Sequence, residues 1–516
     1  MSRTDNVIRN TIWGNINKII SLLLPFVVRT ILIKVLGEQY LGISSLLISV
    51  INVLNLADLG FSSAIVFSMY KPFYENNTEV ICALLGFYRK IYCYVGMIIT
   101  VVGLTLLPLL HFLIEGDFPA DLNLYIIYAI YLFNTVIPYF IFGYRVSIFY
   151  ASQRNDIYFK ILSAVTVIQY LIQILVLLIL ENYYAYIVVQ SCIVIIQYFA
   201  VYSFSKKYYP FYNPNGKICE DLKRDIFHRV FALLGHKIGG TIIISIDSII
   251  ISSYLGLILL GKYSNYYYIV NSIIGITNIV IQASLSSIGN KILSDKPSDN
   301  YETFQHLSFA WNWVVSWCTI CFVCLFQPFI QLWVGTEYIL PFYVVVVLST
   351  YYYAWQFRVM GHNFKDSAGL WNDDFAKPYI GMVANLILSI LLVKITNDVI
   401  GVLIPTICVM VLLYFPWETV IIFRKIFNCK SNRYLQQCAI FLLLTIVLVL
   451  STNWICSLLP DIGVISFIIK IIICFIFPNV VLIALFLKNK NFIYFISLLR
   501  KKVYAHQDSG PKPSGL

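Results

Sequence analysis

The segment LGEQYLG occupies residues 36–42, and the similar segment LGLILLG occupies residues 255–261, a shift of 219 residues. In each copy a long apolar stretch precedes the motif, and a second apolar stretch with an Asn at the equivalent position, Asn52 or Asn271, follows it. The identical pairs are Lys18, Ile19, Leu36, Gly37, Leu41, Gly42, Ser45, Asn52 and Ala64 with Lys237, Ile238, Leu255, Gly256, Leu260, Gly261, Ser264, Asn271 and Ala283. We therefore predict two copies of one membrane-spanning unit, an arrangement usual in transporters that bind substrate between their halves.

The composition excludes a soluble protein. Hydrophobic residues make up 59% of the 516 residues, charged residues make up 12%, and the mean hydropathy is +0.80. A soluble domain usually has about 25% charged residues with which to cover its surface. We expect an all-α integral membrane protein. Its first apolar segment, 13–36, exceeds the roughly 20 residues that cross a bilayer and shows no signal-peptide cleavage pattern, so it should persist as a membrane helix.

Apolar runs bounded by charged residues, Gly or Pro predict about fourteen transmembrane helices. The expected segments are 13–36, 40–69, 80–110, 122–150, 157–180, 183–204, 229–255, 259–288, 306–332, 340–363, 376–396, 399–423, 435–458 and 463–487. The first twelve form two six-helix lobes, one for each copy of the repeat, and the last two lie outside the duplication.

Cationic residues gather in alternate connections between these segments. They crowd the loop 205–228 and the stretch 424–433, whereas the intervening turns are poor in Lys and Arg. Because positively charged loops remain in the cytoplasm, we expect both termini and the 205–228 loop on that side. Six spans per copy give both copies the same orientation, so the repeat should be parallel, with its axis along the membrane normal.

These patterns predict the division of the chain. We expect an N-terminal lobe at 1–204, a cytoplasmic linker at 205–228, a C-terminal lobe at 229–428 and two extra helices at 429–504. The tail 505–516 is rich in Ser, Gly and Pro near its end, and we interpret it as a remnant added to the natural chain.

The twelve cysteines are scattered, and several fall inside predicted spans, so we expect no disulfide framework. Cys318, Cys321 and Cys324 recur at intervals of three on one predicted helix. Because no Asp or His accompanies them at matching spacing, we interpret them as small apolar packing residues. We assign no metal and no cofactor.

Arg29 lies about sixteen residues into the first helix, roughly 20 Å or more from its cytoplasmic start. A charge at membrane depth costs about 2.5 kcal/mol or more, so it needs a partner, water or a function. Arg29 either extends to the outer surface or lines a water-filled cavity beside the kink at Pro25. Asp247 corresponds to Val28 in the repeat, so Arg29 and Asp247 should lie at similar depth. We hypothesise an ion pair between them, for which an anionic substrate or a proton competes.

Other polar residues are duplicated or deeply placed. Lys18 and Lys237 lie near the cytoplasmic start of each repeat, where they would either receive a diphosphate or merely satisfy topology. Asn52 and Asn271 lie in mid-span, where helix–helix hydrogen bonding and substrate contact are equally open. Asp58 is either a protonation site or a capping carboxylate.

Several further charges fall near cytoplasmic helix ends. We expect Arg89, Arg145 and Arg358 to reach the lipid headgroups. His362 has no evident partner in the sequence and is interpreted as interfacial. Tyrosines are abundant, and we attribute them to interfacial belts rather than to a sugar site.

Several motifs resemble the polysaccharide or O-antigen flippases (Wzx type) of the multidrug/oligosaccharidyl-lipid/polysaccharide superfamily. The resemblance extends over nearly the whole chain. It is carried by Ile8-Arg9-Asn10-Thr11 through Leu36-Gly37, Tyr40-Leu41-Gly42, Asp58-Leu59-Gly60-Phe61, Asp247-Ser248-Ile249-Ile250-Ile251-Ser252 through Leu255-Gly256, and Tyr263-Ser264.

The resemblance implies a fold like that of multidrug (MATE) transporters, with two six-helix lobes beside a central cavity. It implies movement of an oligosaccharide on undecaprenyl diphosphate from the cytoplasmic to the outer leaflet of a bacterial cytoplasmic membrane, by alternating access coupled to H⁺ or Na⁺. Asp247 and Asp58 are the carboxylates expected to couple the ion. Polysaccharide polymerase or export proteins are possible partners, and nucleic acid is not expected.

Two other functions remain open. A multidrug or cation antiporter would share the duplication but should carry less buried cationic character than Arg29 indicates. A membrane polysaccharide polymerase or ligase handles the same donor but needs a large outer loop with catalytic Arg or His, whereas the outer connections here are short. No acid–base pair, nucleophile constellation or nucleotide loop is evident, so we do not expect an enzyme.

Overall fold

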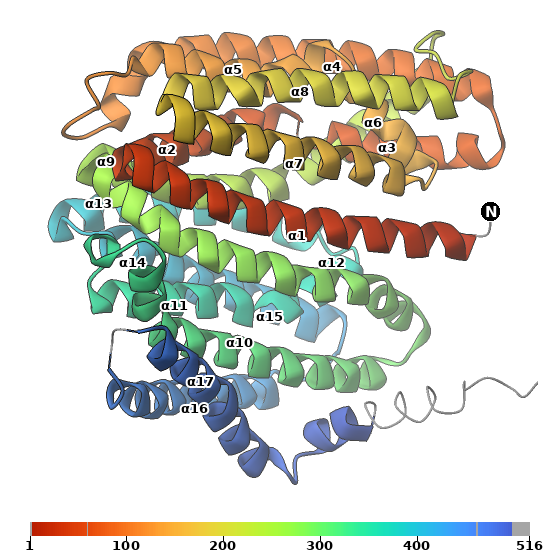
Figure 1. Cartoon of the computed structure of the whole chain (residues 1–516). Coiled ribbons are helices and arrows are strands. Elements are labelled where there is room, and N and C mark those ends of the chain that lie inside the picture. The colour runs from red at the N-terminus through yellow and green to blue at the C-terminus, as the bar shows by residue number, and fades with distance from the viewer. Residues whose placement is uncertain (1–2, 59, 461–462, 498–516) are drawn as a thin grey trace, which may run out of the picture. The chain divides into compact units, whose positions relative to one another are not determined.

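The computed structural model describes residues 3–58, 60–460 and 463–497 (Figure 1). Regular structure in this part of the chain is helical throughout, which confirms the all-α prediction. The α-helices are α1 (Arg3–Leu36), α2 (Glu38–Leu54), α3 (Phe61–Tyr74), α4 (Thr78–Leu106), α5 (Leu124–Phe140), α6 (Val146–Ala151), α7 (Asn155–Leu180), α8 (Tyr183–Tyr208), α9 (Glu220–Ser294), α10 (Pro297–Trp333), α11 (Phe342–Phe357), α12 (Val359–Ser367), α13 (Lys377–Thr396), α14 (Ile400–Cys408), α15 (Phe415–Lys425), α16 (Asn432–Ser457) and α17 (Val464–Phe486).

The helices are those of a multi-pass membrane protein. Ten helical segments among the described residues are long and apolar enough to cross a bilayer, and the bent pair α5–α6 brings the number to eleven. Each of the fourteen expected segments coincides with a helix, part of a helix or a helix pair. Three do not count as separate spans: 40–69, 340–363 and one of the two segments that α9 covers. The expected segment 40–69 is divided into α2 and α3 by a 3-10 turn at Asn55–Asp58, and α11 has only 16 residues. The number fourteen stays a prediction.

Helix α9 has 75 residues and covers two expected spans, 229–255 and 259–288. Gly256 interrupts it with φ 85° and ψ 173°. Gly37, its counterpart in the repeat, separates α1 from α2 with φ 100° and ψ 176°. Residues with a side chain almost never adopt this conformation, which explains why Leu-Gly recurs at the same place in both copies.

Asparagine side chains define the starts of three helices in the first half. Asn77 accepts a hydrogen bond from the backbone N–H of Val80 at 3.1 Å, at the start of α4. Asn123 and Asn182 cap α5 and α8 in the same way. Such caps satisfy backbone donors that the first helical turn leaves without a partner.

The chain divides into two compact units. Unit 1 comprises Met1–Asn265 and Pro378–Val402, and unit 2 comprises Tyr266–Lys377 and Leu403–Leu516. In unit 1, α1 packs along α7, and α8 packs against α5 and α7 (Figure 1). In unit 2, α10 packs against α11, α16 and α17. The expected lobe boundaries at residues 204 and 229 stay a prediction.

The two repeats meet within unit 1 through a reciprocal backbone contact. Gly42 faces the carbonyl oxygen of Leu257, and Gly261 faces the carbonyl oxygen of Glu38. A Cβ atom at either glycine would lie less than 3.0 Å from that oxygen, closer than real Cβ atoms approach. The shift of 219 residues converts the first contact into the second, because 42 + 219 = 261 and 38 + 219 = 257. Reciprocity of this kind is the property of a contact across a two-fold axis, so the duplicated glycines make equivalent contacts in space.

We expect Gly42→Ala and Gly261→Ala each to destabilise the protein by about 1–3 kcal/mol, because the added methyl group forces two backbones apart. Gly240→Ala is the matched control, since a Cβ there meets no atom within 4 Å. Thermal unfolding of the detergent-solubilised protein, followed by size-exclusion chromatography of heated samples, measures the effect. If both variants are as stable as Gly240→Ala, the reciprocal contact does not exist in the folded protein.

Candidate functional site

Arg29 connects the two repeats. It lies in α1, seven residues before Leu36, the last residue of that helix, and is half-buried. Its Nη2 atom donates a hydrogen bond to Ser264 Oγ at 2.8 Å, and Ser264 Oγ in turn donates to the Gly261 carbonyl at 2.8 Å. Ser264 lies one turn beyond the close backbone contact at Gly261. The contact between the repeats therefore also brings the guanidinium group to α9.

A cluster of hydroxyl groups lies on the helices next to Arg29. Ser44 of α2 and Tyr183 of α8 hydrogen-bond to each other at 2.7 Å, and Tyr131 of α5 donates to Ser44 at 3.2 Å. All three side chains are buried. The guanidinium of Arg29 interacts electrostatically with Tyr186, whose ring lies 5.9 Å from that of Tyr183. The attribution of the tyrosines to interfacial belts stays a prediction. The hydrogen bonds of Tyr183 join residues 52 and 139 positions apart in the chain, so they could not be recognised in the sequence.

Asp247 is buried in α9, with 1% of its surface exposed. It belongs to a series of buried polar residues along the first part of that helix, together with Ser245, Ser252, Ser264 and Asn265. Buried polar groups within membrane helices commonly mark functional positions. The ion pair between Arg29 and Asp247 stays a prediction.

The duplicated residues differ in their surroundings. Lys18 is half-buried in α1, whereas Asn52 and Asn271 are both exposed on the surface of their own unit. The side chains of Lys237 and Asp58 lie outside the part of the structure that is described. The structure therefore places Arg29 and Asp247 in unit 1 as buried or half-buried groups and leaves the other predicted site residues as predictions.

A second polar region, in unit 2, consists of buried ion pairs. Arg358 Nη1 lies 2.7 Å from Glu418 Oε1, and Lys377 Nζ lies 2.6 Å from the same oxygen. Lys377 also contacts Asp374 Oδ2 at 2.6 Å, and Lys365 lies 2.5 Å from that atom. These groups link α11–α12 to the start of α13 and to α15. We call this set the unit 2 ion network.

His362 joins the unit 2 ion network. Its Nδ1 atom lies 3.2 Å from Glu418 Oε1, and its Nε2 atom lies 3.3 Å from Asp366 Oδ2. The interpretation of His362 as a residue without a partner is therefore wrong. Asp366 is four residues away on the same helix and was overlooked, whereas Glu418 is 56 positions away and becomes a neighbour only when α12 and α15 pack together.

Two arginines that were expected to reach the headgroups are held inside the protein. Arg358 is 8% exposed and pairs with Glu418. Arg145 is 1% exposed, donates to Ser205 Oγ at 3.1 Å and lies 5.0 Å from the centre of the Tyr202 ring. A buried guanidinium persists only with such partners, so both residues stabilise the packing of their helices.

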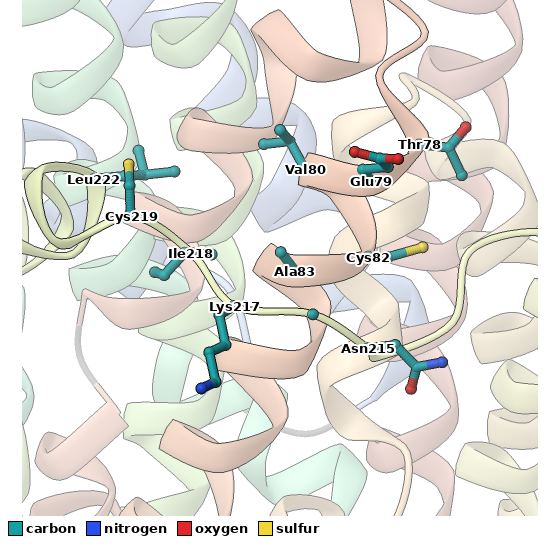
Figure 2. Close-up of a pocket in the computed structure, with 11 residues that line it drawn as sticks. Thr78, Glu79, Val80, Cys82, Ala83, Asn215, Lys217, Ile218, Cys219 and Leu222 are labelled. Carbon is teal, nitrogen blue, oxygen red and sulfur yellow. The ribbon is translucent and has the colours of Figure 1, made fainter.

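A cavity of about 660 Å³ lies between the start of α4 and the segment 215–222. Figure 2 shows Glu79 and Thr78 on the helix and Lys217 on the facing segment, its ammonium group pointing away from Glu79. Glycine permits the close packing of this segment, because Gly216 has φ 98°. The predicted site residues do not line this cavity, so we do not include it in the candidate site.

Three solved structures with the same fold are distant from this chain in sequence. The "Lipid II flippase MurJ, inward closed conformation" is 14% identical, covers 93% of this chain and 99% of that chain, and has a TM-score of 0.62. An inward-facing multidrug resistance MATE family transporter of the MOP superfamily is 12% identical, covers 81% and 98%, and has a TM-score of 0.59. A MOP superfamily transporter from Pyrococcus furiosus is 13% identical, covers 81% and 95%, and has a TM-score of 0.51. These matches confirm the MATE-like fold.

No curated protein sequence matches the chain. A family model described as polysaccharide biosynthesis protein matches residues 7–286, which is more than half of the chain and includes both Leu-Gly motifs of the repeat. The chain therefore belongs to the polysaccharide biosynthesis protein family, as its sequence motifs predicted.

Proposed function

We propose that the protein is a flippase that carries an oligosaccharide linked to undecaprenyl diphosphate from the cytoplasmic to the outer leaflet of a bacterial cytoplasmic membrane. Membership of the polysaccharide biosynthesis family and the fold of membrane transporters and flippases support the class of activity. The observation that carries the substrate is Arg29, a guanidinium group within a membrane helix that donates a hydrogen bond to Ser264 of the second repeat and interacts electrostatically with Tyr186 of the first.

A diphosphate suits this site chemically. Guanidinium groups bind phosphate oxygens through two parallel charged hydrogen bonds, which are stronger than a bond to a neutral hydroxyl. A phosphate can therefore replace Ser264 as the acceptor for Arg29. The hydroxyl groups of Ser44, Tyr131 and Tyr183, which hydrogen-bond to one another, would offer donors to sugar or phosphate oxygens.

Replacement of Ser264 would also change how the repeats are connected. The bond from Arg29 to Ser264 joins α1 of the first copy to α9 of the second. A diphosphate that takes over the guanidinium group would break this bond, and departure of the substrate would allow it to form again. Substrate binding would thus favour one of two arrangements of the helices, as alternating access requires.

Ion coupling assigns a role to Asp247. A carboxylate that is 1% exposed in a membrane helix carries a large desolvation cost when charged, and binding of H⁺ or Na⁺ removes that cost. Loading of the ion would then favour the arrangement in which Asp247 is most deeply buried. Asp58, the second expected carboxylate, is proposed on the sequence alone. In this proposal the termini and the 205–228 loop face the cytoplasm, where polymerase or export proteins would reach them.

We expect Arg29→Ala to reduce transport about 10-fold to 100-fold, because charged hydrogen bonds contribute about 1.5–3 kcal/mol and each 1.4 kcal/mol is tenfold. The measurement uses proteoliposomes that contain undecaprenyl diphosphate bearing one N-acetylglucosamine, with leaflet exposure detected by an added galactosyltransferase. Arg29→Lys should retain part of the activity. Arg89→Ala, which removes an exposed arginine, should be unaffected. Wild-type rates for Arg29→Ala would refute the assignment of the phosphate site, and transport of cationic dyes without transport of the lipid would favour the multidrug antiporter.

We expect Asp247→Asn to abolish the dependence of transport on an imposed proton or sodium gradient. The amide carries no negative charge, so it has no charge for H⁺ or Na⁺ to neutralise. The same proteoliposomes are assayed with and without each gradient. Asp225→Asn is the control, since Asp225 is exposed on α9 and pairs with Arg229. A gradient that still accelerates the Asp247→Asn protein as much as the wild type would remove Asp247 from the coupling mechanism.

A further inference from the structure

Three cysteines from three helices meet in the interior of unit 2. They are Cys324 of α10, Cys456 of α16 and Cys474 of α17, and their sulfur atoms all lie within 4.8 Å of one another. All three are buried. The sequence directs attention to Cys318, Cys321 and Cys324 on one helix, but the packing selects only Cys324 and adds one thiol from each of two other helices.

We propose that Cys324, Cys456 and Cys474 bind a divalent, thiol-seeking metal ion of the Zn²⁺ class. Three thiolates around a tetrahedral ion with bonds of about 2.3 Å lie about 3.8 Å apart. The sulfur atoms of Cys456 and Cys474 are 4.0 Å apart, so movements of a few tenths of an ångström complete that edge of the site. This separation is also well beyond the length of a disulfide bond, about 2.05 Å.

The charges around the cysteines suit a divalent ion. Lys470 lies one turn before Cys474 on α17, is 3% exposed and interacts electrostatically with Cys456. The charges of three thiolates, one divalent cation and one ammonium group sum to zero. A neutral sum matters because the remaining walls, Ile320, Leu448 and Leu482, are apolar and would not stabilise a net charge.

A small cavity supplies the fourth coordination position. It has a volume of about 200 Å³, and its lining includes Cys324, Cys456, Asn453, Ser457 and Lys470. Zinc sites with three protein ligands keep the fourth position for water or another oxygen ligand. The cavity is large enough for water and polar enough to hold it, and it gives the three thiol protons that metal binding displaces a route away from the sulfur atoms.

The ion would hold α16 and α17, the two helices outside the repeat, against α10. Two hydrogen bonds already connect α10 to α17, from Trp313 to Asn479 at 2.8 Å and from Trp317 to the carbonyl of Cys474 at 3.0 Å. Thr445 of α16 donates to Ser316 Oγ of α10 at 2.7 Å. The metal would add bonds to the same interface. This role does not depend on which substrate the protein transports.

The test is metal binding by the full-length purified protein after treatment with a chelator. We expect one Cd²⁺ per chain, seen by its thiolate charge-transfer absorption, and one Zn²⁺ in competition with a chromophoric chelator. Cys324→Ser and Cys474→Ser should each weaken binding at least 100-fold. Cys318→Ser, on the same helix as Cys324, and Cys192→Ser, on the exposed surface of α8, should bind like the wild type.

A second measurement, the protection of the thiols from alkylation by bound metal, uses the wild-type protein. It therefore tests the proposal even if the variants at the buried cysteines fold poorly. In the wild type, Zn²⁺ should slow alkylation of Cys456 and Cys474 by a membrane-permeant maleimide, as measured by mass spectrometry, and should raise the unfolding temperature. Equal alkylation with and without Zn²⁺ would overturn the proposal. A disulfide between Cys456 and Cys474 that forms without metal binding would overturn it too. Because these readouts do not involve transport, their failure is distinct from failure of the proposed flippase activity.

Discussion

The close contact of Gly42 with the Leu257 carbonyl, and of Gly261 with the Glu38 carbonyl, is the constraint on which the first unit depends. Helices in a membrane gain little from burying apolar surface against each other, because lipid is as apolar as leucine. They associate instead where small residues let backbones approach. In the reciprocal contact the backbones approach closely at two places, and the duplication makes these two places equivalent. Gly37 and Gly256, both with positive φ, turn the chain just before each contact. In each copy the Leu-Gly motif therefore makes the turn and the following Gly makes the close backbone contact.

The polar site follows from that contact. Ser264 lies one turn beyond Gly261, so the approach of the two backbones also brings its hydroxyl within reach of Arg29. A guanidinium group so deep in a helix would otherwise need water or lipid headgroups as partners. Packing between the repeats therefore creates the position where a charged side chain is tolerated, and it is this position that we propose for the anionic headgroup.

The sequence predicts the fold well and the site only in part. Hydropathy and the repeat identify a helical membrane protein because lipid forces backbone groups to pair within helices, and this constraint is visible residue by residue. The depth of Arg29 is visible for the same reason. The contact of Arg29 with Ser264 cannot be predicted from the sequence, although Ser264 is one of the duplicated residues. Such a contact depends on how the helices are rotated about their axes. The tyrosine hydroxyls and His362 escape sequence reasoning for that reason as well.

The unit 2 ion network supports our proposal that phosphate binds at Arg29 rather than at a better buried cation. Lys365 and Lys377 each contact a carboxylate oxygen of Asp374, and Arg358 and Lys377 contact the same oxygen of Glu418. Removing one member of such a set leaves a buried charge without compensation, at a cost of about 3–5 kcal/mol. A phosphate would have to displace carboxylates that the helices hold in place. At Arg29 the proposed exchange is with the hydroxyl group of Ser264, so a phosphate there replaces an uncharged acceptor and does not have to displace a carboxylate of the unit 2 ion network.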